Sequence, residues 1–425
     1  MTRVLRCLLL PAAMLALAVA VAVPLAAQQP VRVGVVTFIS GPAAGPFGVP
    51  ARNGAELTAE MLNAGNVPAP YAGKGFGGNP IELVIIDENG GPQKQVTEFR
   101  NLAPRVDLVI GYISSGDCLA IAPVAEELKK FTVLFDCGTP RIFEEASYKY
   151  VFRTGPHATL DNVSIALYLL ERHPNVKSIA GINQNYAWGQ DSWVDFEAAM
   201  KALKPGIEVK TSQMPKLMAG QFGAEITTLL ASGADVIHSS FWGGDLEGLV
   251  LQGAPRGLFE KHKIVLSAGE SAIPRLGTKI PDGTILGGRG PFGPFAPDTE
   301  LSRWFKAAYE ERYSLPPSYP AYRISQAILG VKAAYEKAQK AGAASPTQEQ
   351  IIAAFENSTF EGPGGVVKMA LGKGHQAVMD TAIGTVKNEG GQLKVVDIVR
   401  YPAERVLPPE GVKAEAWIKS GFKAK

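Results

Sequence analysis

The chain has few of the residues that build metal centres and nucleophilic sites. It contains 425 residues, of which three are cysteine and five are histidine. No metal-ligand spacing links the histidines, and none stands beside a Cys or Ser in a nucleophile motif. They are His157, His173, His238, His262 and His375. We therefore expect no catalytic residues, no bound metal, no cofactor and no enzymatic activity.

An excess of charge of either sign is also missing. The formal net charge is +2, from 42 Lys and Arg against 40 Asp and Glu, and the sequence contains no basic run. Such a balance argues against nucleic acid or an anionic membrane surface as the main partner. Hydrophobic residues make up 46% of the sequence, which is ample for two cores in a chain of this length.

Long hydrophobic runs are confined to the N-terminus. Arg3 and Arg6 precede an apolar run over residues 8–23, which ends in PLAA at residues 24–27. This pattern predicts a secretory signal cleaved near Ala27, and hence an exported, periplasmic protein. An uncleaved membrane anchor is the alternative, although the run is short for a bilayer span. Cleavage would remove both arginines and leave equal numbers of basic and acidic residues.

Apolar runs rich in β-branched residues alternate with amphipathic stretches along the rest of the chain. The expected strands cover residues 31–38, 81–88, 106–113, 131–137, 177–183, 207–213, 234–241 and 263–268. The expected helices cover residues 51–63, 93–102, 117–129, 159–171, 190–203, 219–231 and 245–252. This alternation predicts an α/β fold with parallel sheets. Ligands of such sheets bind in the loops at the carboxyl ends of strands.

One of these loops has the features of an anion site. Residues 106–123 consist of a β-branched run, the turn Ser114-Ser115-Gly116 and the start of a helix. Unpaired amides at a helix N-terminus, the helix dipole and a serine hydroxyl could together hold a carboxylate. The alternative is that Ser115 or Asp117 only caps the helix.

Three other loops, which follow the expected strands at residues 177–183, 234–241 and 263–268, carry rings or carboxyl groups. Tyr186 and Trp188 follow an expected strand and could form ring walls of a cleft, or a hydrophobic staple at a helix start. Asp245 and Glu270 also follow strands, so either could receive a ligand ammonium group. Alternatively, Asp245 caps its helix and Glu270 pairs with an arginine.

Several motifs along the chain together resemble a known family. They are VRVGVVTFISGPAAGPFG with NGAELTAEMLNAG, IELVIIDENGGPQKQV, GYISSGDCLAIAPVAEE, INQNYAWGQDSWVDFEAAMKAL, and SYPAYRISQAILGVKAAYEKA with TFEGPGGVVKM. In this order the chain resembles the periplasmic solute-binding proteins of ABC importers, in particular the branched-chain amino acid (Leu/Ile/Val-binding) family with the type I fold. The resemblance covers nearly all of the chain after the signal.

The resemblance implies two Rossmann-like lobes with parallel sheets, joined by three hinge crossings and enclosing a small solute in the cleft between them. It implies a monomer that delivers this solute to the permease subunits in the inner membrane. Tyr186 would contact the ligand and Glu270 would hold an α-amino group. The ligand carboxylate would then lie at Ser114 and Ser115.

The crossings are expected near Arg153, Arg289 and Gly364. The signal would cover residues 1–27, and the first lobe residues 28–153 and 285–364. The second lobe would cover residues 154–284 and 365–402, and a C-terminal extension residues 403–425.

The sequence also departs from the family pattern. The loop after residues 131–135 reads Asp136-Cys137-Gly138-Thr139, where Gly138 could offer an amide and Thr139 a hydroxyl to the ligand, while Cys137 is unexpected. Rings near the expected cleft suggest a ligand with more planar surface than a small aliphatic amino acid; they are Phe38, Phe47, Tyr112, Tyr186, Trp188, Phe241 and Trp242. Binding of an amide, urea or aromatic acid, or a ligand-sensing receptor of the same fold, are the alternatives.

The two cysteines that follow the signal are expected to form a disulfide. Cys118 lies in the first turn of one expected helix, and Cys137 ends the next expected strand. These positions share one edge of a doubly wound sheet, and a single cysteine pair in an exported protein is usually oxidised. The alternative is two buried thiols that lie too far apart to bridge.

Overall fold

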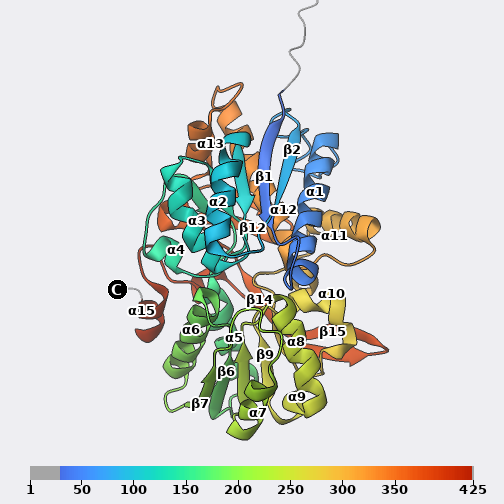
Figure 1. The fold of residues 1–425 in the computed structure, drawn as a ribbon, viewed down its shortest axis with the longest axis vertical. Coiled ribbons are helices and arrows are strands. Elements are labelled where there is room, and N and C mark those ends of the chain that lie inside the picture. The colour runs from blue at the N-terminus through green and yellow to red at the C-terminus, as the bar shows by residue number, and fades with distance from the viewer. Residues whose placement is uncertain (1–28, 424–425) are drawn as a thin grey trace, which may run out of the picture.

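The computed structural model describes residues 29–423, which form two lobes stacked end to end, each built on one sheet (Figure 1). The expected signal, residues 1–27, lies outside the described residues. The first sheet has the strand order β11-β12-β13-β5-β4-β3-β1-β2. Its strands are β1 (Val31–Thr37), β2 (Ile81–Asp87), β3 (Leu108–Gly111), β4 (Thr132–Leu134), β5 (Val151–Arg153), β11 (Thr359–Gly362), β12 (Gly365–Leu371) and β13 (Gln376–Val378).

The first five strands of this sheet are parallel. The sequence predicted β1 to β4 as strands, whereas near β5 it predicted only a crossing at Arg153. In β1, Val31 lies opposite Ile81 of β2, and Val33 lies opposite Leu108 of β3. Because β1 is flanked by β2 on one side and β3 on the other, the winding of the chain reverses between β1 and β3. Such a switch point leaves a crevice at the carboxyl ends of the strands.

The second sheet repeats this plan in the order β15-β14-β10-β9-β8-β6-β7, with its switch point between β6 and β8. Its strands are β6 (Ser178–Ile182), β7 (Glu208–Gln213), β8 (Val236–Ser239), β9 (Lys263–Leu266), β10 (Ile285–Gly287), β14 (Thr381–Glu389) and β15 (Gln392–Tyr401). The first five are parallel, and β14 and β15 join antiparallel. The predicted α/β class with two Rossmann-like lobes is therefore confirmed.

Helices cover the faces of both sheets. In the first lobe they are α1 (Val49–Ala64), α2 (Pro92–Leu102), α3 (Ser115–Glu127), α4 (Arg141–Glu144), α11 (Glu300–Tyr313), α12 (Tyr319–Lys340) and α13 (Gln348–Phe355). In the second they are α5 (Ala158–Arg172), α6 (Ala187–Leu203), α7 (Gly223–Ser232), α8 (Gly243–Gly253), α9 (Leu258–Lys261) and α10 (Ile273–Leu276), followed by α14 (Ala403–Val406) and α15 (Ala414–Lys419). Within residues 29–423, no helix has both the length and the apolar character needed to span a membrane.

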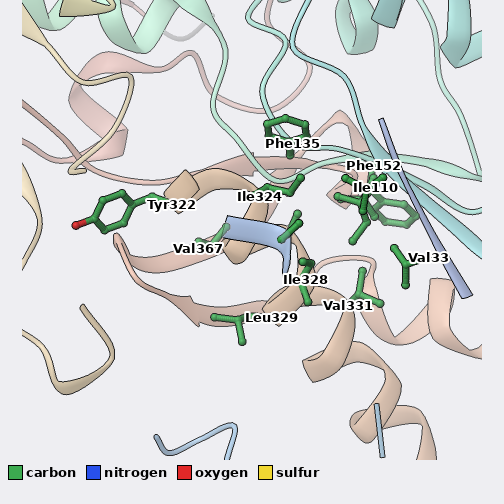
Figure 2. Packing of buried hydrophobic residues seen from close by; sticks show 14 of the residues in the cluster. Val33, Ile110, Phe135, Phe152, Tyr322, Ile324, Ile328, Leu329, Val331 and Val367 are labelled. Atoms are coloured by element: carbon green, nitrogen blue, oxygen red, sulfur yellow. The ribbon is translucent and has the colours of Figure 1, made fainter. Parts of the chain in front are cut away.

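The core of the first lobe forms where α12 packs on the sheet. Figure 2 shows Ile324, Ile328 and Val331 of α12 near Val33 of β1 and Phe152 of β5. All of these side chains are fully buried, and burial of one such side chain contributes roughly 1.5–3 kcal/mol. The second lobe has two clusters, one centred on α5 and α6 and one on α7 and α8.

The chain passes between the lobes three times, and two expected boundaries need correction. The first passage follows β5, the second follows β10, and the third lies between Val378 and Thr381. Strand β10 belongs to the second sheet, so the expected start of the first lobe's second segment at residue 285 was wrong. Strands β12 and β13 belong to the first sheet, so residues 365–378 were wrongly expected in the second lobe.

The expected crossing near Gly364 is a β-hairpin. Strands β11 and β12 pair antiparallel, with Gly362 opposite Gly365. Gly365 has a φ of 110°, a conformation that favours glycine. The glycines therefore make a tight turn instead of a hinge, and the alternation of buried and exposed residues in TFEG was the signal for a strand.

Candidate functional site

The candidate site lies where the switch points of the two sheets face each other. A small cavity of about 10 Å³ remains there, close to the space that one water molecule needs. Strands β1, β3, β4, β6, β8 and β10 each lead into one of the loops or turns that line it. The lining residues are Phe47, Ile113, Ser115, Asp136, Gly138, Tyr186, Trp188, Trp242, Arg289 and Tyr319.

Residues predicted from the sequence make up much of this lining. The structure brings together Phe47, Ser115, Gly138, Tyr186, Trp188 and Trp242, all of which were expected to contact the ligand. Sequence reasoning missed four lining residues, which are Ile113, Asp136, Arg289 and Tyr319. Asp136 lies near the end of the expected strand at residues 131–137, so its position was a usable signal. Arg289 was predicted only as the place of a crossing, and Tyr319 appeared only within the motif SYPAYRISQAILGVKAAYEKA.

The aromatic walls are held by contacts with one another. The ring centroids of Phe47 and Trp242 lie 5.1 Å apart, and those of Phe47 and Tyr319 lie 5.2 Å apart. The indole N–H of Trp242 donates to the hydroxyl of Tyr186 at 2.7 Å, and that of Trp188 donates to the carbonyl of Ser240 at 2.7 Å. Because their polar atoms are already bonded, these rings present apolar faces in fixed positions.

Arg289 provides a positive charge in this aromatic surrounding. Its Nη1 donates to Asp161 at 3.2 Å, and its Nη2 donates to the carbonyl of Asp136 at 2.9 Å. The guanidinium carbon lies 4.1 Å from the ring centroid of Trp188, a distance at which the cation and ring attract. Burial lowers the pKa of Arg289, but the nearby Asp161 and Asp136 outweigh it and raise that pKa. The group therefore stays charged.

Two further arginines are buried beside this pair of aspartates. Arg323 Nη1 donates to Asp136 Oδ1 at 2.7 Å, and Arg153 donates to the carbonyl of Cys137 at 2.7 Å. Burial and neighbouring arginines lower the pKa of Arg153 to about 9 and that of Arg323 to about 10, so both remain charged at neutral pH. Arg289 and Arg323 thus pair with Asp136 and Asp161, whereas Arg153 is bonded to uncharged groups.

The turn at Ser114 and Ser115 is organised differently from the expectation. The carboxylate of Glu88 accepts the N–H groups of Ile113 at 2.8 Å and Ser114 at 2.7 Å. The helix cap is Ser114, whose hydroxyl oxygen accepts the N–H of Asp117 at 3.4 Å, so the alternative that Ser115 or Asp117 caps the helix was wrong. The amides of Ile113 and Ser114 are therefore already hydrogen-bonded to Glu88 within the protein. Glu88 ends an expected strand, and this role could not be read from its position.

Ser115 is the residue of this turn that reaches the cavity. Its hydroxyl oxygen accepts the N–H groups of Gly138 at 3.1 Å and Thr139 at 3.2 Å. The hydroxyl hydrogen is left to donate to a ligand. Ser115 thus keeps its expected place beside the cavity, but as a hydroxyl donor that also fixes the loop of Gly138.

Five predicted ligand residues do not line the cavity. Tyr112 packs with Cys118 and Leu134 in a cluster between the first sheet and α3. Thr139 turns its hydroxyl to Asp191, at 2.6 Å. The remaining three are Ser114, Asp245 and Glu270. The polar groups of Ser114, Thr139, Asp245 and Glu270 are used in contacts within the protein, whereas the buried hydroxyl of Tyr112 has no hydrogen-bond partner among the described residues.

The two carboxyl groups expected to receive an ammonium group are held away from the lining. Asp245 accepts the N–H groups of Met218 at 2.7 Å and Gly220 at 3.0 Å. Glu270 accepts the N–H of Tyr319, the first residue of α12, at 2.8 Å. Burial raises the pKa of Glu270 to about 8, so its carboxyl is largely neutral at pH 7 and is a poor partner for a cation.

The structure contains the predicted disulfide. Cys118 and Cys137 are bonded, with their Cα atoms 6.4 Å apart. The bond links the start of α3 to the loop after β4, and both segments line the cavity through Ser115 and Gly138. It therefore fixes one wall of the site.

Removal of this bond is expected to destabilise the protein. A variant with Ser in place of both Cys118 and Cys137 should lose about 3 kcal/mol of unfolding free energy, because the bond closes a loop of roughly 20 residues in the unfolded chain. Urea denaturation of the variant and the wild type measures this difference. The wild type treated with reductant should behave like the variant. Two alkylatable thiols in unreduced wild-type protein, seen by mass spectrometry, would contradict the bond.

Two α/β lobes joined by three passages, with a lined cavity between their facing switch points, define a two-lobed solute-binding protein. The family model for periplasmic binding proteins matches residues 30–392. The chain belongs to the periplasmic binding protein family. This is a family of binding proteins, as the sequence resemblance implied.

Known relatives agree with this placement. The chain is 26% identical over 362 residues to Leu/Ile/Val-binding protein homolog 4 of Brucella melitensis biotype 1, with 81% of each chain covered. Its fold is similar to that of an ABC transporter solute-binding protein from Rhodopseudomonas palustris BisB5 in complex with 3,4-dihydroxybenzoic acid. That match has a TM-score of 0.75 and 19% identity, and covers 88% of this chain and 98% of the other.

A second solved structure has a similar fold. It is the leucine-, isoleucine-, valine-, threonine- and alanine-binding protein of Brucella ovis in its closed conformation. The match has a TM-score of 0.74 and 21% identity, and covers 90% of this chain and 97% of the other.

Proposed function

We propose that this chain is the exported, periplasmic receptor of an ABC importer, and that it captures a small planar carboxylate and delivers it to the permease in the inner membrane. The signal is cleaved near Ala27. The observation that carries the proposed ligand class is Arg289, a buried cation in a cavity lined by Phe47, Trp188 and Trp242. The complex with 3,4-dihydroxybenzoic acid in a protein of similar fold supports it.

The charges around the cavity favour an anion. Arg289 lines the cavity, and the buried Arg153 and Arg323 lie close to it, so a ligand carboxylate would be attracted to this side of the cavity. Arg289 presents a planar fork that suits a carboxylate. Of its five N–H hydrogens, three are used in the contacts with Asp136 and Asp161. The hydroxyl of Ser115 would add a second donor.

The rings suit the remainder of such a ligand. Planar rings from both lobes line the cavity, with Phe47 from the first lobe and Trp188 and Trp242 from the second. A flat ligand would contact both lobes only when they are closed. Its binding would therefore shift the open and closed equilibrium toward the closed form.

An α-amino acid is the second candidate, and one observation favours it. Asp136 also lines the cavity, and its carboxylate could receive an ammonium group. It already accepts hydrogen bonds from Arg289 and Arg323, which weakens this candidate. Glu270, to which the family resemblance assigned the ammonium group, lies outside the lining.

A thermal-shift comparison tests the proposed ligand class. Mature protein, freed of any bound solute by unfolding and refolding, is mixed with benzoate, 3,4-dihydroxybenzoate, benzyl alcohol or leucine. Both acids should raise Tm, because a ligand at a hundred times its Kd adds about 2.7 kcal/mol of stability. Benzyl alcohol has the ring without the charge and should have no effect. An equal shift with benzyl alcohol, or a shift with leucine alone, would contradict the proposal.

A further inference from the structure

One carboxylate outside the cavity joins the two lobes directly. Asp191 belongs to α6 of the second lobe, and two groups of the first lobe donate to it. The Thr139 hydroxyl donates to Asp191 Oδ2 at 2.6 Å, and Arg141 Nε donates to Oδ1 at 2.9 Å. Arg141 Nη2 makes a further contact with Oδ1. These residues, Thr139, Arg141 and Asp191, are called the lobe clasp below.

The clasp is partly shielded from water. The side chain of Asp191 is 10% exposed and that of Arg141 is 38% exposed, so the pair is screened less than a surface ion pair. The N–H of Arg141 also donates to the Thr139 hydroxyl at 3.3 Å, which holds the two donors in one arrangement. The contact is thus a preformed pair of donors facing one acceptor.

A second link between the lobes lies at the same edge. Residues 402–423, called the C-terminal strap, bury Leu407, Trp417 and Ile418 in the cluster of α5 and α6 in the second lobe. The strap also contacts the first lobe, since the N–H of Ala414 donates to Glu144 of α4 at 2.7 Å. Figure 1 shows α15 beside α6 and close to α4.

The position of the clasp links it to the cavity. Thr139 directly follows Gly138, which lines the cavity, and α6 begins with Ala187 and Trp188, of which Trp188 lines it from the other lobe. Because Asp191 lies on the same helix as Trp188, a rotation that moves Trp188 away from Gly138 would also draw Asp191 away from Thr139 and Arg141. The clasp therefore forms with closure, although none of its members lines the cavity.

We propose that Asp191 is a positioning residue for closure, which acts through Thr139 and Arg141 and sets the open and closed equilibrium. The affinity for any enclosed ligand then depends on a contact that the ligand does not touch, because apparent Kd falls as the closed fraction rises. The inference rests on closure of the cleft, as in the proposed function, but not on the identity of the ligand.

Substitution of Asp191 in the full mature chain tests the clasp. Asp191→Ala should weaken binding of benzoate, used as the probe, by about tenfold, with most of the change in the dissociation rate. Without probe, its radius of gyration in X-ray scattering should exceed that of the wild type. Glu197→Gln is the matched control, because Glu197 lies on the same helix and pairs only with Lys201 four residues away. It should match the wild type in both measurements.

A second variant separates the clasp from a general loss of stability. Thr139→Val removes the hydroxyl with little change in shape, and its effect on Kd should not add to that of Asp191→Ala, because both remove the same contact. If Asp191→Ala fails to fold, Thr139→Val alone decides. A folded variant with wild-type scattering and a wild-type dissociation rate overturns the proposal. If the wild type does not bind benzoate, the ligand class is wrong, and scattering without probe still tests the clasp.

Discussion

Arg289→Gln is expected to raise the Kd for benzoate by about a hundredfold or more. Loss of one partner from a buried charge pair costs roughly 2–5 kcal/mol, and 1.4 kcal/mol corresponds to a factor of ten. Arg289 is 2% exposed, and its guanidinium stacks on Trp188. Water therefore cannot take the place of the guanidinium in the variant. Titration calorimetry measures the change.

Two further variants make this result specific. Arg289→Lys keeps the charge but loses the planar fork and the stacking on Trp188, so its Kd should lie between those of the wild type and Arg289→Gln. Arg303→Gln removes an exposed arginine that pairs with Asp298 and should leave Kd unchanged. Because Arg289 also neutralises Asp136 and Asp161, the Tm of both Arg289 variants will fall. Binding is therefore compared under conditions where circular dichroism shows that each variant is folded. A folded Arg289→Gln protein with wild-type Kd would contradict the role of Arg289.

Phenylacetate is expected to bind more tightly than phenylglycine, with a Kd that is lower by about a hundredfold or more. The two ligands share the ring and the carboxylate, and phenylglycine adds an ammonium group. Enclosing this cation beside Arg289, where Asp136 is already paired with two arginines, leaves it poorly compensated, which costs several kcal/mol. Competition titration against a common probe gives the ratio.

The opposite preference would identify an amino acid receptor. Asp136→Asn distinguishes the two cases, since it should weaken phenylglycine far more than phenylacetate only if Asp136 holds the ammonium group. Equal affinities of the wild type for both ligands would show that the amine remains in solvent, and would contradict the enclosed site.

Local sequence patterns predicted most of the fold and part of the site. The expected strand at residues 31–38 and the expected helix at residues 159–171 agree with β1 and α5 to within one residue at each end. Both were predictable because the apolar run of the strand and the amphipathic spacing of the helix continue along the whole element. Phe47, Ser115 and Trp188 could be placed near the cavity because each follows a strand at the switch points. The hairpin of β11 and β12 was missed because its glycines are equally compatible with a hinge.

The charged part of the site could not be predicted for a different reason. Arg289 and Arg323 meet Asp136 across separations of 153 and 187 residues. No local pattern encodes such a meeting, which depends on how three passages bring the segments together. The capture of the Ile113 and Ser114 amides by Glu88 likewise joins the ends of β2 and β3, two strands that β1 separates in the sheet. Sequence position places a residue at a sheet edge, but not the partner that its side chain selects.

The three passages between the lobes also determine when the chain can fold as it is made. The first sheet ends with β13 at Val378 and the second with β15 at Tyr401. Neither sheet is contiguous in the sequence, so synthesis must pass residue 378 before either one has all its strands. This chain therefore cannot complete one lobe before the other begins to form, as in folding domain by domain from the N-terminus. Each lobe therefore receives its last strand only near the C-terminal end of the chain, the first lobe with β13 and the second with β15.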